Sequence, residues 1–109
     1  MENTKLIYDW IEDMLNRDIF SNSYEEYDDD VKFYNAYVSI FNRDERIQID
    51  YIEDEDVVYM TDDYGNRESF TYLVEENDFF LFKEKFMDSL EKLLKKTIVD
   101  AMYDVINNN

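Results

Sequence analysis

An excess of acidic residues is the feature that most limits what this chain can fold into and bind. Its 109 residues contain 28 Asp and Glu against 11 Lys and Arg, which gives a formal charge of −17 at neutral pH. A surface of this sign repels phosphate groups, and we therefore expect no direct binding to nucleic acid. The chain also has 45% hydrophobic and 17% aromatic residues. Acidic disordered chains are poor in both, so this chain is expected to bury a core.

Missing residue types narrow the possible chemistry further. The chain has no Cys, no His and no Pro, which removes disulfide frameworks, zinc sites, thiol catalysis and the commonest general base. Its one glycine, Gly65, cannot form a Gly-rich phosphate loop. The sequence shows neither a long apolar run nor a signal peptide at its start. We expect a cytoplasmic protein with no membrane segment and no cofactor.

Hydrophobic spacing predicts a helix near each end of the chain. Apolar residues recur every three or four positions in residues 4–18, with Trp10 as an expected core anchor. Residues 78–106 show the same period, with Asn77 as a candidate N-cap. A straight helix of that length would be about 43 Å long, against a diameter of roughly 34 Å for a compact domain of this size. The segment is therefore expected to be one long helix, a bent helix or two helices, with residues 95–97 as the candidate position of a break.

Alternating apolar and polar residues predict a sheet between the helices. Four strands are expected, at residues 31–41, 46–52, 57–61 and 67–74. Polar turns separate them, and the last turn holds Gly65, where a hairpin needs positive φ. Residues 19–30 show no clear period and are expected to form an acidic connection. Short links between strands indicate an antiparallel meander. The predicted fold is one α+β domain over residues 1–109, with the helices packed on one face of the sheet.

The negative charge is concentrated in part of the chain. Residues 1–82 contain 23 acids and 6 bases, whereas residues 83–109 contain five of each. Alternate turns of an antiparallel meander lie at the same end of the sheet, which gathers ten of these carboxylates there, with Lys32 as the one base nearby. The candidate partner-binding residues are Glu25, Glu26, Asp28, Asp29, Asp30, Glu53, Asp54, Glu55, Asp56, Glu75, Glu76 and Asp78.

Crowded carboxylates repel one another, so a positively charged partner is expected to offset the cost. Seventeen charges at the spacing of duplex DNA, one per 1.7 Å, would span about 29 Å. This density is comparable to that of a short duplex. The sequence therefore predicts binding to a basic protein surface that normally holds nucleic acid.

In size, charge and element order, the chain resembles the small acidic phage and mobile-element proteins that inhibit host enzymes by DNA mimicry. These include anti-CRISPR proteins, anti-restriction proteins and uracil-DNA glycosylase inhibitors. The resemblance rests on no alignable motif and assigns no role to individual residues. It implies a non-enzymatic inhibitor that occupies the DNA- or PAM-binding cleft of a defence nuclease.

Other functions fit parts of the pattern. An immunity protein or antitoxin for a basic nuclease toxin would need the same acidic face. Paired carboxylates can perform acid–base chemistry, but a chain this short with short turns leaves little room for a pocket, and no catalysis is expected. A calcium loop aligned on Gly65 would place Met60 at its first ligand position, which does not fit. Weak divalent-ion binding at residues 28–30 or 53–56 stays open.

The first predicted strand carries a second apolar surface. Its odd-numbered positions include Phe33, Tyr37 and Phe41, on the face opposite the expected helices. Exposed apolar patches often mark interfaces, so homodimerisation through the sheet is an open possibility. The alternative is that residues 19–27 cover this patch.

Overall fold

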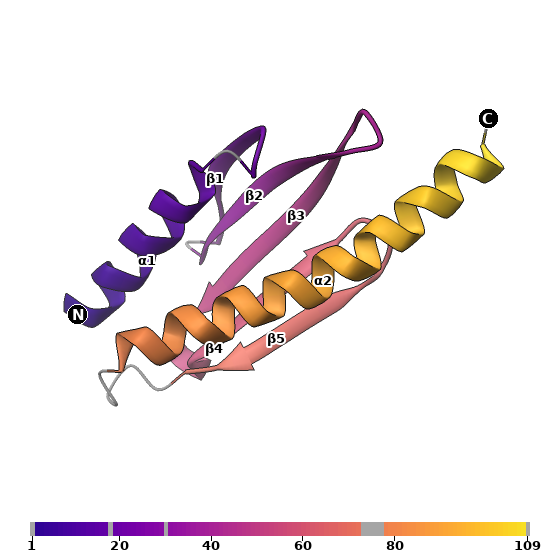
Figure 1. Cartoon of the computed structure of the whole chain (residues 1–109). Coiled ribbons are helices and arrows are strands. Elements are labelled where there is room, and N and C mark those ends of the chain that lie inside the picture. The colour runs from indigo at the N-terminus through magenta and orange to yellow at the C-terminus, as the bar shows by residue number, and fades with distance from the viewer. Residues whose placement is uncertain (1, 18, 30, 73–77, 109) are drawn as a thin grey trace.

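The computed structural model describes residues 2–17, 19–29, 31–72 and 78–108. It has an α+β fold with an N-terminal helix, an antiparallel sheet and a C-terminal helix packed on the sheet, as the sequence predicts (Figure 1). The elements are α1 (Glu2–Leu15), β1 (Asn22–Asp28), β2 (Val31–Ile40), β3 (Arg43–Ile52), the 3₁₀ helix η1 (Glu53–Glu55), β4 (Val57–Asp62), β5 (Arg67–Thr71) and α2 (Phe79–Asn107). No helix within these ranges is long and apolar enough to cross a membrane.

The sheet has five strands in the order β1-β2-β3-β4-β5, one more than predicted. The additional strand is β1, which lies in the segment expected to be a connection. It pairs with β2 along its whole length, from Asn22 opposite Tyr37 to Asp28 opposite Val31. Almost all of its side chains are exposed because it is an edge strand. It therefore lacks the apolar alternation by which strands are recognised. It precedes the first predicted strand, so the other turns stay at their predicted ends.

The turn between β2 and β3 is shorter than predicted. The chain reverses at Phe41 and Asn42, whose φ angles of 54° and 62° suit a two-residue hairpin. Residues 43–45, expected in the turn, belong to β3. Glu45 is only 7% exposed, and its Oε1 accepts a hydrogen bond of 2.7 Å from the hydroxyl of Tyr64. The turn before β5 is where it was predicted, with Gly65 at a φ of 88°.

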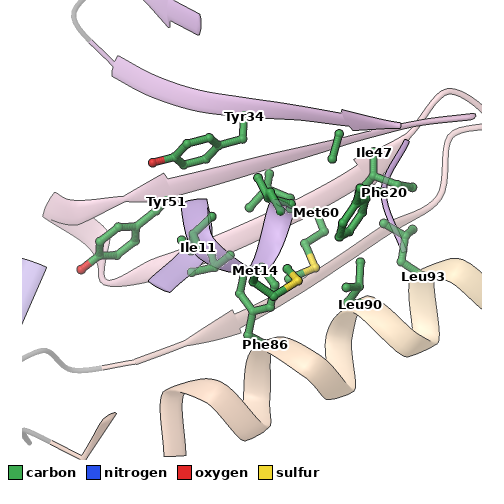
Figure 2. Close-up of a cluster of buried hydrophobic side chains, with 14 of the residues drawn as sticks. Ile11, Met14, Phe20, Tyr34, Ile47, Tyr51, Met60, Phe86, Leu90 and Leu93 are labelled. Atoms are coloured by element: carbon green, nitrogen blue, oxygen red, sulfur yellow. The ribbon is translucent and has the colours of Figure 1, made fainter. Parts of the chain in front are cut away.

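Both helices cover the same face of the sheet and share one core with it (Figure 2). The buried side chains from the helices are Ile7, Ile11, Met14, Leu15, Phe82, Phe86, Leu90, Leu93 and Ala101. Trp10 is partly buried at the edge of this core rather than at its centre. Its ring packs edge-on against Phe82 and Phe86, at centroid distances of 5.8 and 4.9 Å. The tryptophan therefore joins α1 to α2.

The C-terminal helix is one long helix, continuous over 29 residues, and the candidate break at residues 95–97 is wrong. Thr97 is fully buried, with its hydroxyl 2.7 Å from Asp62 Oδ2 and 2.9 Å from the Leu93 carbonyl oxygen. The molecule measures 49 × 26 × 23 Å, so the assumption of a compact shape was the error. Figure 1 shows the helix extending beyond the sheet. Asp78 caps it by accepting the Leu81 N–H (3.0 Å), and the candidate cap Asn77 lies outside the described residues.

The face of the sheet opposite the helices carries the second apolar surface. Phe33 and Tyr37 are half-buried on it, and Phe41 is 51% exposed. Residues 22–27 do not fold over this surface, since they extend the sheet as part of β1. Homodimerisation through this face stays a prediction.

Candidate functional site

The meander brings the acidic turns together at one end of the sheet. The β1–β2 hairpin and the η1 turn lie at the same end, because the two ladders put Val31 and Ile52 at matching ends of adjacent strands. Two inter-strand spacings, about 10 Å, separate β1 from β3. We call the described carboxylates of this hairpin and turn the acidic end: Glu25, Glu26, Asp28, Asp29, Glu53, Asp54, Glu55 and Asp56. The other predicted residues are Asp78, the cap of α2, and Asp30, Glu75 and Glu76, which lie outside the described residues.

Local backbone geometry accounts for only some of these acids. Asp29 and Asp56 have left-handed φ angles of 49° and 51°, a conformation that Asp tolerates better than most residues. The Asp56 N–H donates to the Glu53 carbonyl (3.2 Å), and its own carbonyl accepts the Tyr72 N–H (2.8 Å). These bonds hold the turn against the end of β5. Glu53, Asp54 and Glu55 are all exposed, and turn geometry gives no reason for three acids in a row.

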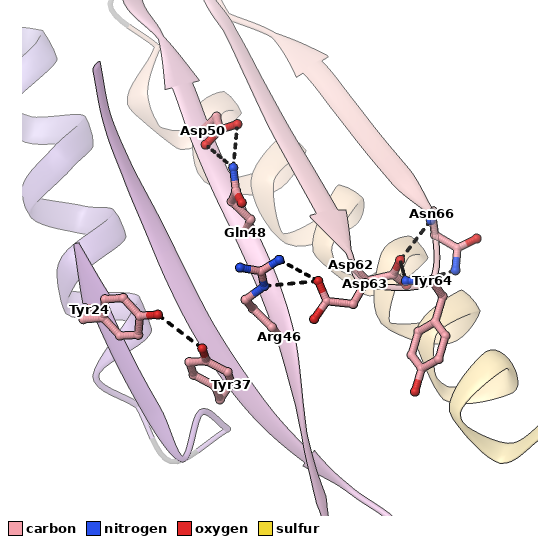
Figure 3. A network of polar contacts seen from close by, with 9 residues as sticks. All are labelled: Tyr24, Tyr37, Arg46, Gln48, Asp50, Asp62, Asp63, Tyr64 and Asn66. Atoms are coloured by element: carbon pink, nitrogen blue, oxygen red, sulfur yellow. Dashed lines mark hydrogen bonds and ion pairs between the residues drawn. The ribbon is translucent and has the colours of Figure 1, made fainter. Parts of the chain in front are cut away.

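Ion pairs are scarcer at the acidic end than in the rest of the described part of the chain, where most carboxylates have one. Glu25 is its one member with an ion-pair partner among the described residues, 3.0 Å from Lys32 Nζ. The other seven carboxylates have none within that part of the chain. At the opposite end, Arg43 pairs with Asp104 (2.6 Å), and Arg46 pairs with Asp63 (2.7 Å; Figure 3). The bases therefore neutralise other regions and leave this end with uncompensated charge.

Lys32 does not neutralise the seven unpaired acids. Its side chain is 20% exposed and its Nζ lies 3.0 Å from Glu25 and 3.5 Å from Glu12 of α1. The ammonium also lies over the ring of Tyr8, 4.8 Å from the centroid, and near that of Tyr34 (5.4 Å). Burial alone would lower the pKa of Lys32, but the hydrogen bond to Glu25 and the charges around it raise the pKa above its ordinary value. The lysine therefore stays charged and balanced by its own two carboxylates.

The acidic surface continues onto the open face of the sheet. Glu26 lies opposite Phe33, which lies opposite Asp50, so strand pairing places both acids on this face. Burial raises the pKa of Asp50, although Gln48 donates to its two carboxylate oxygens at 3.2 and 3.3 Å (Figure 3). Beside them, the rings of Tyr24 and Tyr37 stack at 6.1 Å. The face thus combines negative charge with aromatic surface.

A cavity of about 370 Å³ opens next to the η1 turn, where the sequence predicted little room for a pocket. We call it the tyrosine cavity; its lining residues are Tyr8, Val31, Lys32, Tyr51, Ile52, Glu53 and Asp54. The rings of Tyr8 and Tyr51 meet at a centroid distance of 5.5 Å and an angle of 58°. The cavity forms because α1 lies over the ends of β2 and β3, a tertiary arrangement that spacing in the sequence does not reveal.

The two tyrosines of the cavity are held in their neutral form. Burial, together with the Glu53 carboxylate, raises the pKa of Tyr8 well above its ordinary value. Burial raises the pKa of Tyr51 to about 12, with further contributions from the charges of Asp56 and Glu53. Sequence reasoning did not select Tyr8. The alternation of β3 does place Tyr51 on the same buried face as Ile47 and Ile49.

No group of three or more His, Cys, Asp or Glu side chains in the described part of the chain is arranged to hold a metal ion. No protein-family model, curated protein or solved structure matches this chain.

Proposed function

We propose that this chain is a non-enzymatic inhibitor that presents a DNA-like acidic surface to a basic nucleic-acid-binding protein. Its target would be a host-defence or DNA-processing enzyme, as for the anti-CRISPR and anti-restriction proteins that the chain resembles in size and charge. One observation carries the proposal. Seven carboxylates at one end have no ion-pair partner among the described residues, while Arg43, Arg46 and Lys96 pair with acids elsewhere.

A basic groove is the partner that best offsets the cost of this arrangement. Like charges within a Debye length of about 8 Å repel one another even at physiological salt. Lys and Arg side chains that line a DNA-binding groove would remove this repulsion. They would also release the counterions held by both surfaces, as they do on binding a duplex. Charge of opposite sign would further steer the encounter and raise the association rate.

The geometry narrows the set of residues expected to contact the partner. Glu53, Asp54 and Glu55 are exposed on one short turn, and Glu26 and Asp28 are exposed on the edge strand. We expect these side chains to form most of the contacts. Glu25 and Asp78 already have partners inside the molecule, in Lys32 and the start of α2. Asp30, Glu75 and Glu76 stay in the proposal as neighbours in sequence.

Capture from a host lysate tests the proposal. The immobilised chain should retain a nucleic-acid-binding protein, and an excess of short duplex DNA should release it. The affinity should fall steeply between about 50 and about 500 mM NaCl, because both surfaces release counterions. A complex unaffected by salt and by DNA would contradict charge mimicry. A nuclease toxin that binds the chain and duplex DNA together would instead indicate an immunity protein bound beside the active site.

A further inference from the structure

We propose that the tyrosine cavity binds one guanidinium group, supplied by an arginine side chain of the basic partner. This inference rests on the proposed function and names its anchoring contact. The acidic end would supply general attraction, and the cavity would supply a single specific site within it. Arginine is enriched among the few residues that contribute most to binding at protein interfaces.

The cavity has the size and walls that such a group needs. Its volume of about 370 Å³ is many times the space that one water molecule needs. Val31 and Ile52 give it apolar walls, and Glu53 and Asp54 place two carboxylates at its rim. The stem of an arginine can pack against the apolar side chains while its planar head group reaches the acids.

An unsatisfied hydroxyl in the wall of the cavity points to a ligand independently of the acids. Tyr51 is 2% exposed, and its hydroxyl oxygen has no hydrogen-bond partner among the described residues. The Thr4 side chain lies close enough to lower the pKa of Tyr51 slightly, but it makes no hydrogen bond of full geometry with the hydroxyl. Figure 2 shows the Tyr51 and Tyr34 hydroxyls at the same end of the core, away from Phe20 and Leu93. A buried polar atom without a partner is costly. The oxygen is closed to solvent in this structure, so the ligand would open the wall by a small side-chain shift, and a guanidinium N–H donating to the Tyr51 oxygen would then remove that cost.

The charges around the cavity select a cation. Lys32 is the one base in its wall, and it is paired with Glu12 and Glu25. Together with Glu53 and Asp54, this makes four carboxylates against one ammonium. An anion would meet a net negative site. The ammonium of Lys32 over the Tyr8 ring shows that a cation already packs against aromatic surface here.

Guanidinium fits this site better than a second ammonium does. It is weakly hydrated, so it tolerates the apolar walls. It donates several hydrogen bonds in one plane, which allows simultaneous contact with the Tyr51 hydroxyl and a rim carboxylate. An ammonium is a compact, strongly hydrated charge and would lose more hydration on entering.

Titration of the ¹⁵N-labelled full chain with N-acetyl-arginine amide tests the proposal. Amide signals around Tyr8 and residues 51–54 should shift and saturate. The citrulline analogue, which has the same shape but no charge, should cause no saturable shift. The lysine analogue should bind at least about fivefold more weakly, because of its hydration. Equal responses to arginine and lysine would overturn the proposal of a guanidinium site.

Matched variants locate the binding within the cavity. Glu53→Gln and Glu55→Gln remove the same charge from the same turn, but only Glu53 lines the cavity. Glu53→Gln should weaken arginine binding roughly tenfold through loss of a charge-assisted hydrogen bond, and Glu55→Gln by less than about twofold. Tyr51→Phe should also weaken binding while leaving the melting temperature unchanged or higher, since its hydroxyl is unpartnered. Equal losses in the two glutamine variants would overturn the proposal.

The two proposals fail separately. If arginine shifts spread over all acidic turns without saturation, the cavity site is wrong, while DNA-sensitive capture of a basic protein would still support the inhibitor function. If arginine binds in the cavity but no basic protein is retained from the lysate, the cavity site stands and the inhibitor function is wrong.

Discussion

Individual carboxylates serve different purposes in this molecule, and Asp62 shows the structural one. Its side chain accepts the backbone N–H groups of Tyr64 and Asn66, both at 2.9 Å, and organises the turn between β4 and β5 (Figure 3). The Thr97 hydroxyl lies 2.7 Å from its other oxygen. Burial alone would raise the pKa of Asp62, but the hydrogen bonds from Asn66, Thr97 and the backbone lower it below the ordinary value. This acid is satisfied internally, unlike those of the acidic end.

Asp62→Ala should reduce the free energy of unfolding by about 2 kcal/mol, because it removes hydrogen bonds to an ionised acceptor. The neighbouring change Asp63→Ala breaks only an exposed pair with Arg46 and should cost less than about 1 kcal/mol. The folded pKa of Asp62 is lowered, so its contribution is present above the unfolded pKa of about 3.9 and is lost as the pH falls through the folded pKa. Denaturant unfolding at pH 7 and pH 3 measures both effects. Equal losses for the two variants at pH 7 would contradict this role.

Asp50 behaves in the opposite way. Burial raises its folded pKa, so the ionised side chain destabilises the fold once the pH exceeds the unfolded pKa of about 3.9. Asp50→Asn keeps an acceptor for Gln48 and removes the charge. The variant should therefore melt at a higher temperature than the wild type at pH 7, and the gain should vanish at pH 3. Thermal unfolding at both pH values checks this, and a lower melting temperature at pH 7 would contradict it.

At the level of elements, sequence periodicity predicts those that bury an apolar face. The stripes of α1 and α2 and the alternation in β3 all identify side chains that the core contains, such as Ile11, Ile49 and Phe86. The edge strand β1 was not predicted, because backbone pairing with β2 holds it in place and its side chains are mostly exposed. The candidate break in α2 was inferred from an assumed compact shape of the molecule. In the structure, the hydrogen bond between Thr97 and Asp62 instead joins the middle of a continuous helix to the β4–β5 turn.

Asp78 is a predicted binding residue that has a structural role in α2. As the N-cap of α2, its side chain accepts the Leu81 N–H. Asp78→Ala should lower the free energy of unfolding by about 1 kcal/mol, whereas Asp78→Asn, which can still cap, should leave it nearly unchanged. Chemical denaturation of both variants checks the cap. Equal destabilisation by Asn and Ala would indicate that the charge, rather than the cap, matters.

For the whole molecule, the sequence predicts the location of the acidic end but not its neutralisation pattern. In a meander, the order of the strands alone decides which turns lie at the same end of the sheet. Adding β1 before the first predicted strand therefore leaves the other turns at their predicted ends. Which acids find a base depends on tertiary distances, such as that between Arg43 and Asp104, 61 positions apart in sequence. The tyrosine cavity has the same origin, since Tyr8 and Tyr51 meet only when α1 lies on the sheet.

We expect the unpaired carboxylates, rather than the total charge, to bind the basic partner. Two triple variants test it, each removing three negative charges. One changes the unpaired acids of η1: Glu53→Gln, Asp54→Asn and Glu55→Gln. The other changes exposed acids with a base four positions away: Asp13→Asn, Asp88→Asn and Glu91→Gln.

The measurement is the dissociation constant of each triple variant for the captured partner at low salt, with circular dichroism confirming that both are folded. The η1 variant should lose roughly tenfold or more in affinity, because its charges contact the partner. The control should lose less than about twofold, since its charges are already balanced on the helix surfaces. Equal losses in the two variants would show that only net charge matters, and would contradict the account.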